Sequence, residues 1–346
     1  QVIGTVAIPH ECGCEVTSQL EIPTRTLIGT GCHPNVAAAL LISLGCETLD
    51  CEYVVNEISK SKKPVELINM QELGGTIKAT EKGVRIAQKM VQDTSQIEMN
   101  PNEVSALVVG LKCGGSDLTS GLAANPAVGV ASDMIVNMGG TVFMGETPEI
   151  MGAEHLLVKR SANENVAKRI YEIIDWWEQR AKNEGVRFHL ITTGNIEGGL
   201  TTIEEKSLGA IYKAGSSEIQ GVIDYAERPK DKGLFIMNTT GDDINSNTGM
   251  LGGGAHIILF TTGRGSPVGT PIAPVIKITG NPHTYEKMID NMDINAGTII
   301  EGKESIEQVG IRIFNEIVNV ASGKNTKSEE LGHNEFAIFR DRGHAY

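Results

Sequence analysis

The stretch "SALVVGLKCGGSD", residues 105–117, decides the fold, because an apolar run ends there in a cysteine followed by two glycines, a serine and an aspartate. A continuous apolar run of this length suits a strand that is buried on both faces, as in a parallel sheet. Glycines and small polar residues directly after the run indicate a junction between a strand and a loop. The stretch therefore predicts a parallel strand whose carboxyl end presents Cys113 to a loop.

The same pattern returns along the chain and alternates with segments in which apolar residues recur at helical spacing. This alternation predicts an α/β fold. We expect two Rossmann-like α/β domains with largely parallel sheets and a cleft between them, residues 1–99 and 100–346, divided near the polar Asn100-Pro101. The further strand-like runs lie at 2–14, 38–50, 139–150, 187–199, 233–243 and 255–267, and the helical segments at 76–95, 164–185 and 305–324.

The composition limits the partners and the location of the protein. The 346 residues include 43 acidic and 30 basic ones, a net charge of −13, and no basic stripe offsets it, so we expect no nucleic-acid partner. No apolar run reaches the ~18–20 residues that span a bilayer, and no segment resembles a signal peptide, so we expect a cytoplasmic protein without a membrane partner. Six cysteines are too few for a disulfide scaffold. A small anionic substrate would require local cations or backbone amides.

Cysteines follow three of the apolar runs. Cys14, Cys46 and Cys113 each lie beside a glycine and close to a carboxylate. Because ligands of α/β sheets bind beyond the carboxyl ends of strands, we expect these three sulfur atoms to converge on one metal site. Three thiolates suit iron or zinc, and three cysteines that leave one iron open hold the iron–sulfur clusters of hydratases. The alternative is that each cysteine packs as a small buried hydrophobe.

Several other side chains are candidates for the chemistry. His10, directly after the first run, is a candidate base, whereas His33 before Pro34 is left open. Lys206 and Arg264 are the expected substrate cations, since a guanidinium between two glycines can grip a carboxylate with two hydrogen bonds. A solvated helix face and an ordinary turn are the alternatives for these two. The expected substrate-binding residues are Ser116, Asp117, Asn125, Thr201, Thr202, Thr262 and Gly263, and a base or supporting role is open for Glu146, Glu149 and Glu154.

Long motifs give the chain a family resemblance. Among them are "LKCGGSDLTSGLAANPAVG" (111–129), "GGTVFMGETPEIMGAE" (139–154), "GNIEGGLTTIEEKSLGA" (194–210) and "LFTTGRGSP" (259–267). With these motifs the chain resembles the altronate/galactarate dehydratase family, which also includes the large subunit of sulfolactate sulfo-lyase. "HECGC" is similar to the family's His-x-x-Gly-Cys element, with His10 and Cys14 at the matching positions.

The resemblance implies a lyase that eliminates water or sulfite from a hydroxy acid with the help of Fe²⁺, as a single ion or a cluster, or of Mn²⁺. Our first expectation is a hydro-lyase that converts a sugar acid such as altronate or galactarate to a 2-keto-3-deoxy acid through an enediolate. Sulfolactate sulfo-lyase, with sulfite as the leaving group, is the alternative within the family.

The chain departs from the family pattern in one respect. Full-length relatives carry a small N-terminal β-rich domain, or receive it as a small subunit, followed by a Gly-Arg-x-Gly-x-Arg-Asn segment, and this sequence contains neither. We therefore expect a small N-terminal-type domain or subunit as a partner. We also expect the chain to form a homo-oligomer. A third alternative is a non-catalytic binding subunit that acts only with that partner.

Overall fold

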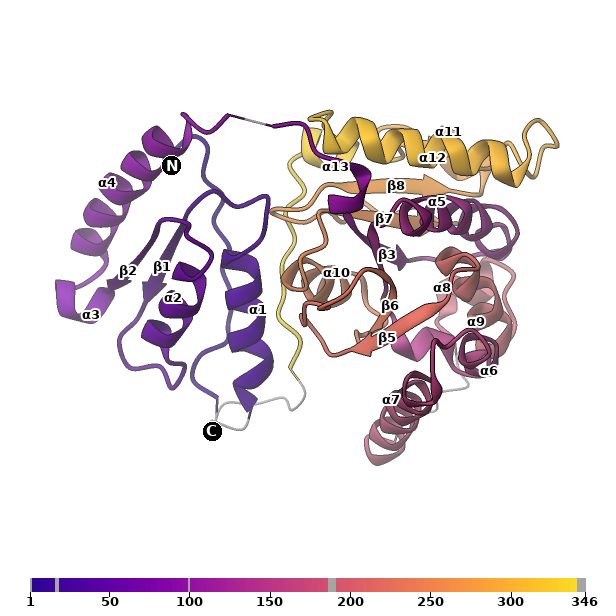
Figure 1. Ribbon diagram of the computed structural model, residues 1–346, viewed down its shortest axis with the longest axis horizontal. Coiled ribbons are helices and arrows are strands. Elements are labelled where there is room, and N and C mark those ends of the chain that lie inside the picture. The colour runs from indigo at the N-terminus through magenta and orange to yellow at the C-terminus, as the bar shows by residue number, and fades with distance from the viewer. Residues whose placement is uncertain (1, 16–18, 99, 186–190, 341–346) are drawn as a thin grey trace.

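The computed structural model describes residues 2–15, 19–98, 100–185 and 191–340, and its largest feature is a seven-stranded sheet (Figure 1). Every pair of neighbouring strands in this sheet is parallel. The strands in order across the sheet are β5 (Ile219–Ile223), β6 (Gly233–Met237), β4 (Thr141–Met144), β3 (Val108–Cys113), β7 (Ile257–Thr262), β8 (Val275–Thr279) and β9 (Ile294–Asn295).

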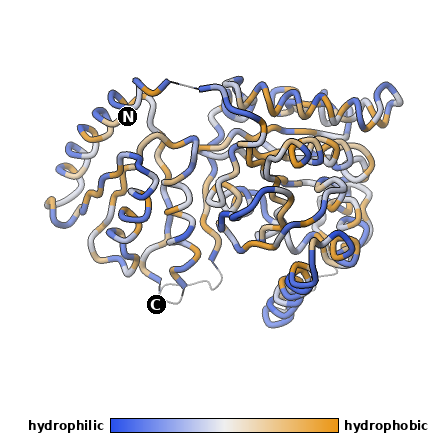
Figure 2. Tube along the Cα trace, in the orientation of Figure 1, coloured by the Kyte–Doolittle hydropathy of each residue, from blue (hydrophilic) through white to orange (hydrophobic). Residues whose placement is uncertain are grey.

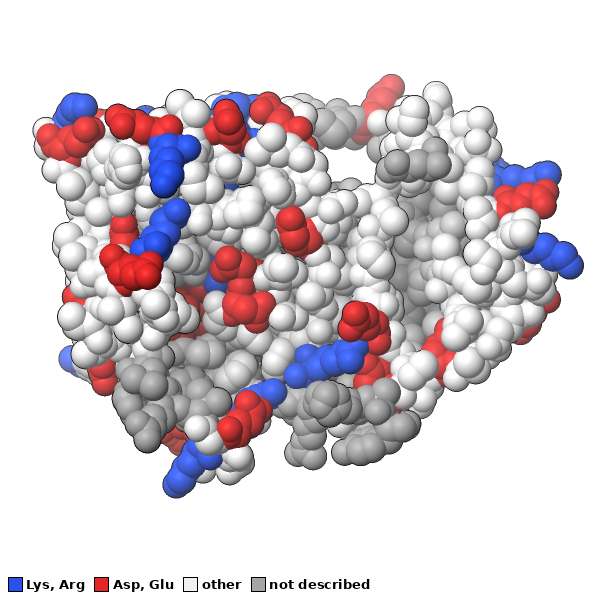
Figure 3. All heavy atoms as spheres, turned by 180° about the vertical axis from the view of Figure 1, so that it is seen from behind, with Lys and Arg blue, Asp and Glu red and all other residues white. Residues whose placement is uncertain are grey.

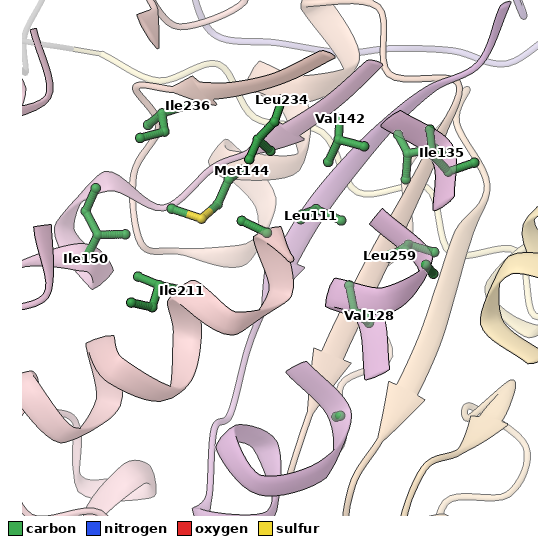
Figure 4. Packing of buried hydrophobic residues seen from close by; sticks show 14 of the residues in the cluster. Leu111, Val128, Ile135, Val142, Met144, Ile150, Ile211, Leu234, Ile236 and Leu259 are labelled. Atoms are coloured by element: carbon green, nitrogen blue, oxygen red, sulfur yellow. The ribbon is translucent and has the colours of Figure 1, made fainter. Parts of the chain in front are cut away.

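The central strands are buried on both faces, which explains their continuous apolar sequences. Every residue of β4, β6, β7 and β8 is buried. Alternate side chains enter two apolar clusters, one on each face of the sheet. Figure 4 shows the larger cluster, in which Leu111, Met144 and Leu259 of the strands pack with Val128 and Ile211 of the covering helices.

Helices cover both faces of this sheet. The larger cluster includes residues of α5, α7 and α12, and α10 packs against β3 on the other face. In α4, α7 and α12, apolar and polar residues alternate at helical spacing, as the hydropathy trace shows (Figure 2). The helices of this part are α5 (Asn125–Asn137), α6 (Glu154–Val158), α7 (Glu164–Asn183), α8 (Thr193–Glu197), α9 (Ile203–Ile211), α10 (Asp243–Gly252), α11 (Pro282–Lys287), α12 (Ile306–Ala321) and α13 (Lys327–Glu330).

The first part of the chain forms a much smaller sheet. It has two parallel strands, β1 (Ala39–Ser43) and β2 (Val65–Asn69), with α1 (Glu21–Gly31), α2 (Cys51–Ser59), α3 (Met70–Leu73) and α4 (Thr76–Thr94). The α/β class is confirmed, whereas two Rossmann-like domains are not, because the described residues of the first part form a sheet of two strands. The run at 2–14 predicted a strand, but residues 2–10 are not one, and in the part of the chain that the structure describes neither sheet includes them. The run predicted at 187–199 begins outside the described residues.

The two parts contact each other through α1, which packs on α10. Beyond α1, His33 Nε2 lies 2.9 Å from the carbonyl oxygen of Ala255, and Asn35 donates to the carbonyl of His256 at 3.1 Å. The C-terminal segment then runs between the parts (Figure 1), where Arg340 lies 3.5 Å from the carboxylate of Glu15. His33 is thus a packing residue at the junction of the two parts.

The strand order identifies where a ligand would bind. From β3 the chain continues to β4 on one side, and it later returns to place β7 on the other side. Ligands of open α/β sheets bind beyond the carboxyl ends of the strands at such a switch point. The carboxyl end of β3 is Cys113. In the part of the chain that the structure describes, no helix is both long and apolar enough to cross a membrane.

Candidate active site

A cluster of buried charges lies at the carboxyl end of β3. The Lys112 ammonium forms an ion pair with one oxygen of Glu146 and donates to the carbonyl of Gly241 at 3.0 Å. The other oxygen of Glu146 accepts from the Lys213 ammonium and from the backbone N–H of Cys113, the latter at 2.7 Å. Lys112 also lies 3.1 Å from Asp243. Two fully buried lysines are therefore held on one fully buried carboxylate.

Glu146 occupies an unusual backbone conformation. It follows β4 with φ 64° and ψ 51°, in the left-handed region that residues other than glycine rarely adopt. Such a conformation costs of order 1–3 kcal/mol and persists where surrounding contacts impose it. Here the contacts are the two ammonium groups and a hydrogen bond from the backbone N–H of Glu146 to Thr239 Oγ1, at 2.7 Å.

A second ion pair lies beside this cluster and is slightly exposed to solvent. Lys206 of α9 pairs with Glu149, which lies in the 3₁₀ turn after β4 (Thr147–Ile150). The Cys113 thiol donates to the other oxygen of Glu149 at 3.4 Å, and its sulfur accepts from Lys213 at 3.2 Å. Cys113 is thus the link between the two pairs.

The cluster fixes the protonation of its members. Burial opposes the charge of Lys112 and Lys213, but the nearby anionic groups outweigh it and raise both pKa values above their ordinary range. Burial also acts to raise the pKa of Glu146, but Lys112 and Lys213 lower it to about 2. Burial, with Glu146 adding to it, raises the pKa of Cys113 to about 12. At neutral pH Lys112 and Lys213 are therefore ammonium groups, Glu146 is a carboxylate and Cys113 is a neutral thiol.

A pocket of about 400 Å³ opens above the cluster. It is lined by Cys113, Gly114 and Gly115 at the end of β3, by Glu149 and Lys206, by Thr192 and Asn195 near α8, by residues 241–244 at the start of α10, and by Val268. All of these residues belong to the seven-stranded part. The pocket therefore lies at one edge of the large sheet, beyond the carboxyl ends of its strands.

Cys113, Glu146 and Glu149 form a group that could hold a metal ion. Among the described residues it is the one group of three His, Cys, Asp or Glu side chains whose ligand atoms all lie within 4.8 Å of one another. However, both oxygens of Glu146 accept from ammonium groups, and Glu149 pairs with Lys206. A divalent ion placed there would lie among three ammonium groups and would be repelled by them. With the lysines in these positions, the group does not fit an additional metal ion.

The three cysteines do not converge as the sequence predicted. Cys14 and Cys46 are exposed in the first part of the chain, where the Cys46 sulfur accepts from Gln71, whereas Cys113 is buried below the pocket. Neither Cys14 nor Cys46 belongs to the group around Cys113. The reason is that Cys46 follows a strand of the small sheet and Cys113 a strand of the large one. His10 is also exposed, and it does not line the pocket.

Of the other predicted residues, Lys206 lines the pocket and the rest do not. Arg264 is 43% exposed and pairs with Glu197 at 2.9 Å. The remaining residues make hydrogen bonds within the fold: Ser116 accepts from Asn195, Asp117 caps its own turn, Asn125 bridges Thr261 and Gly209, Thr201 donates to Glu205, Thr202 caps α9, and Thr262 accepts from Gly265. At Gly263 a Cβ atom would lie 2.0 Å from the Asp117 carboxyl carbon, so the position requires glycine.

Lys112 and Lys213 were not identified as site residues from the sequence. A lysine inside the apolar run "VVGLKC" is a detectable signal, because an unpaired charge is rarely tolerated in a buried strand. Lys213 follows Lys206 by seven residues, which places both on one side of a helix and its continuation. Glu146 and Glu149 were noted only as unassigned carboxylates.

Known proteins are similar in sequence to this chain over most of its length. Residues 1–95 match the family model described as D-galactarate dehydratase/altronate hydrolase, second domain, and residues 104–343 match D-galactarate/altronate dehydratase, C-terminal. The chain is 38% identical over 342 residues to the (2R)-sulfolactate sulfo-lyase subunit beta of Chromohalobacter salexigens, a match that covers 97% of this chain and 87% of that protein.

Two dehydratases are similarly related. Galactarate dehydratase (L-threo-forming) of Escherichia coli strain K12 is 38% identical over 328 residues, which are 92% of this chain and 63% of that protein. Altronate dehydratase of Bacillus subtilis strain 168 is 33% identical over 344 residues, which are 97% and 68% of the two chains. The chain belongs to the D-galactarate/altronate dehydratase family of lyases.

Proposed function

We propose that the chain is a hydro-lyase subunit that eliminates water from a sugar acid such as galactarate or altronate and yields a 2-keto-3-deoxy acid. The observation that carries this proposal is the Lys206–Glu149 pair, which lines a pocket of about 400 Å³ at the switch point of a parallel sheet. The names of two relatives, galactarate dehydratase and altronate dehydratase, support the substrate class.

The reaction requires a base, an anchor for an anion and a path for the leaving group. A base removes the proton from C2 of the 2-hydroxy acid, and the electron pair of the C2–H bond moves into the carboxylate to form an enediolate. The pair then returns to form the C2–C3 double bond while the C3–O bond breaks, and the hydroxide leaves as water with the proton that the base took from C2. The resulting enol becomes the 2-keto acid.

The pocket residues match these requirements. Glu149 is the proposed base, and Lys206 is the proposed anchor for the substrate carboxylate. Burial opposes the charge of Lys206, but Glu149 outweighs it and raises the pKa of Lys206, so the side chain stays an ammonium group. When Glu149 takes the proton it becomes neutral, and the charge of Lys206 is then available to the enediolate. The neutral Cys113 thiol donates to Glu149 and orients it.

The deeper charges act as a fixed support. Three ammonium groups, Lys112, Lys206 and Lys213, face three carboxylates, Glu146, Glu149 and Asp243. Such preorganised charges cost little reorganisation during a reaction that moves negative charge. We therefore assign Lys112, Glu146 and Lys213 the role of positioning Cys113 and Glu149.

The predicted Fe²⁺ or Mn²⁺ remains a prediction, and none of these steps passes through a metal. Metal analysis of the chain after anaerobic purification tests it. One iron or manganese per chain that disappears in the Cys113→Ala variant would place the ion at the Cys113 group, and at least one lysine would then have to move away. A metal-free chain with full activity would contradict the prediction.

Elimination of sulfite from (2R)-sulfolactate is the second candidate. One observation favours it: the relative named as a sulfolactate sulfo-lyase subunit is as similar to this chain as the galactarate dehydratase is. The steps at C2 are the same, and sulfite replaces hydroxide as the leaving group at C3. Because that relative is named a subunit, we also propose that the chain works with a small partner subunit.

An assay of the anaerobically prepared chain, alone and with a small partner subunit, tests these proposals. Galactarate, altronate and sulfolactate are offered separately, and 2-keto acid and sulfite are both measured. Keto acid from a sugar acid supports the dehydratase. Sulfite from sulfolactate alone selects the second candidate, and no product from any of the three, with partner and iron supplied, contradicts both.

A further inference from the structure

A second pocket lies at the opposite edge of the large sheet, where the strands begin. It measures about 160 Å³, and we call it the junction pocket. Val108 and Thr141 at the first positions of β3 and β4 line it, together with His256 directly before β7. Pro34 comes from the first part of the chain, so both parts contribute to the lining.

The lining of the junction pocket is positively charged in a protein whose net charge is −13. Arg228, Lys230 and Lys232 give three positive charges, and Asp231 gives one negative charge, so the lining carries a net charge of +2. A further cation, Lys63, donates to the carbonyl of His33, which is next to Pro34.

These cations have no carboxylate partners within the described residues. Lys232 donates to the carbonyl of Ser105 at 3.0 Å, and Arg228 donates to the carbonyl of Gly29 at 3.3 Å. For Lys230 the described part of the structure contains no hydrogen bond or ion pair. The positive potential affects His256: burial lowers its pKa to about 4, and Arg228 and Lys232 add to the effect.

The pocket also offers hydrogen-bond donors. His256 Nδ1 accepts from the backbone N–H of Val108 at 3.3 Å, so in the neutral ring the proton is on Nε2, which can donate. Gly253 and Gly254 form a wall without side chains. Guanidinium, ammonium and imidazole N–H groups around a small space are the donors that bind phosphate-type anions.

We propose that the junction pocket binds a small tetrahedral oxyanion of the phosphate type, either free or as the end group of a small metabolite. The volume of about 160 Å³ suits such an anion. The site is separate from the candidate active site and does not depend on the proposed function.

Binding to the full chain by titration calorimetry tests the proposal, with inorganic phosphate and glycerol phosphate as separate probes. The double variant Arg228→Gln/Lys230→Gln is compared with Lys78→Gln/Lys82→Gln, which removes the same charge from exposed positions on α4. Circular dichroism verifies that each variant is folded. A third variant, Lys206→Gln, removes the cation of the active-site pocket.

The expected result is one saturable phosphate site in the wild-type chain, weakened about tenfold or more in the Arg228/Lys230 variant. The α4 control and Lys206→Gln should bind phosphate as the wild type does. If inorganic phosphate binds at least as tightly as glycerol phosphate, the site is specific for a free anion. If glycerol phosphate binds more tightly, the site is specific for an esterified one. The proposal is overturned if the Arg228/Lys230 variant binds normally, if Lys206→Gln abolishes binding, or if the wild-type chain shows no saturable binding.

Discussion

The two edges of the seven-stranded sheet use positive charge in opposite ways. At the carboxyl edge, Lys112 and Lys213 are buried, Lys206 is largely so, and each is paired with a carboxylate. At the amino edge, Arg228 and Lys230 line a pocket without such a partner in the described structure. Breaking a buried pair leaves an uncompensated charge, whereas an unpaired cation at a surface is already solvated. The carboxyl edge should therefore be rigid and costly to alter, and the amino edge should respond to added anions.

The largest effect is expected at the centre of the carboxyl edge. The Glu146→Gln variant leaves Lys112 and Lys213 buried without their shared anion, so the free energy of unfolding should fall by about 3–5 kcal/mol. Urea unfolding measures it. The control is Glu81→Gln, which removes an exposed partner of Arg85 and should cost at most about 0.5 kcal/mol. A similar small loss in both variants would mean that the buried cluster is not a stability element.

The next effect concerns catalysis. The Lys206→Met variant keeps most of the side-chain volume but loses the proposed anchor, so kcat/KM for the accepted acid should fall about 10²–10³-fold. Steady-state assays measure the loss, and Lys82→Met on the exposed face of α4 is the matched control. Near wild-type activity in Lys206→Met would remove this lysine from the mechanism.

A smaller effect separates the cysteines. Cys113→Ala removes the hydrogen bond to Glu149, and the activity should fall about tenfold or more while the protein stays folded. Cys46→Ala removes an exposed thiol and should change the activity little. If the two variants lose activity equally, the sequence-based expectation of a shared cysteine site would regain support.

The final effect is a difference in pH dependence between the edges. Burial lowers the pKa of His33, at the junction, to about 4, against about 6.5 in an unfolded chain. The unfolded chain thus binds more protons between these values, so the free energy of unfolding should decrease as the pH falls from 6.5 to 4, with a slope of up to about 1.4 kcal/mol per pH unit for one histidine. At the carboxyl edge, Glu146 has a lowered pKa of about 2, so its contribution should be lost only below about pH 4.5.

Unfolding curves from pH 7 to pH 3 check this order. The His33→Gln variant should have a flatter dependence than the wild type between pH 6.5 and 4 and the same dependence below it. An unchanged slope in that variant would show that His33 is not the titrating group.

Local patterns predicted the elements of the fold better than their arrangement. The strand with Cys113 and the helices at 76–95, 164–185 and 305–324 match β3, α4, α7 and α12 within a few residues. These features depend on apolar periodicity alone. Which sheet a strand joins depends on contacts far apart in the sequence. This is why Cys46, just after β1, and Cys113, at the end of β3, belong to the edges of different sheets although their local sequences are alike.

The candidate site was predictable only in part for the same reason. Lys206 and Cys113 were identified from their loops, and both line the pocket. Lys213 and Glu146 form an ion pair although they are 67 residues apart in the sequence, and no local pattern predicts that contact. Arg264, by contrast, was predicted to bind the substrate because it lies between two glycines. It pairs with Glu197 instead and does not line the pocket.

The central claim is that the acid binds beyond the carboxyl end of β3. A crystal structure of the Glu149→Gln variant, grown anaerobically with galactarate, tests it most directly, because the loss of the proposed base should trap the substrate. We predict a substrate carboxylate on Lys206, beside Cys113 and Gly114. An acid bound at His10, Cys14 and Cys46, with the pocket above β3 free of it, would contradict the account.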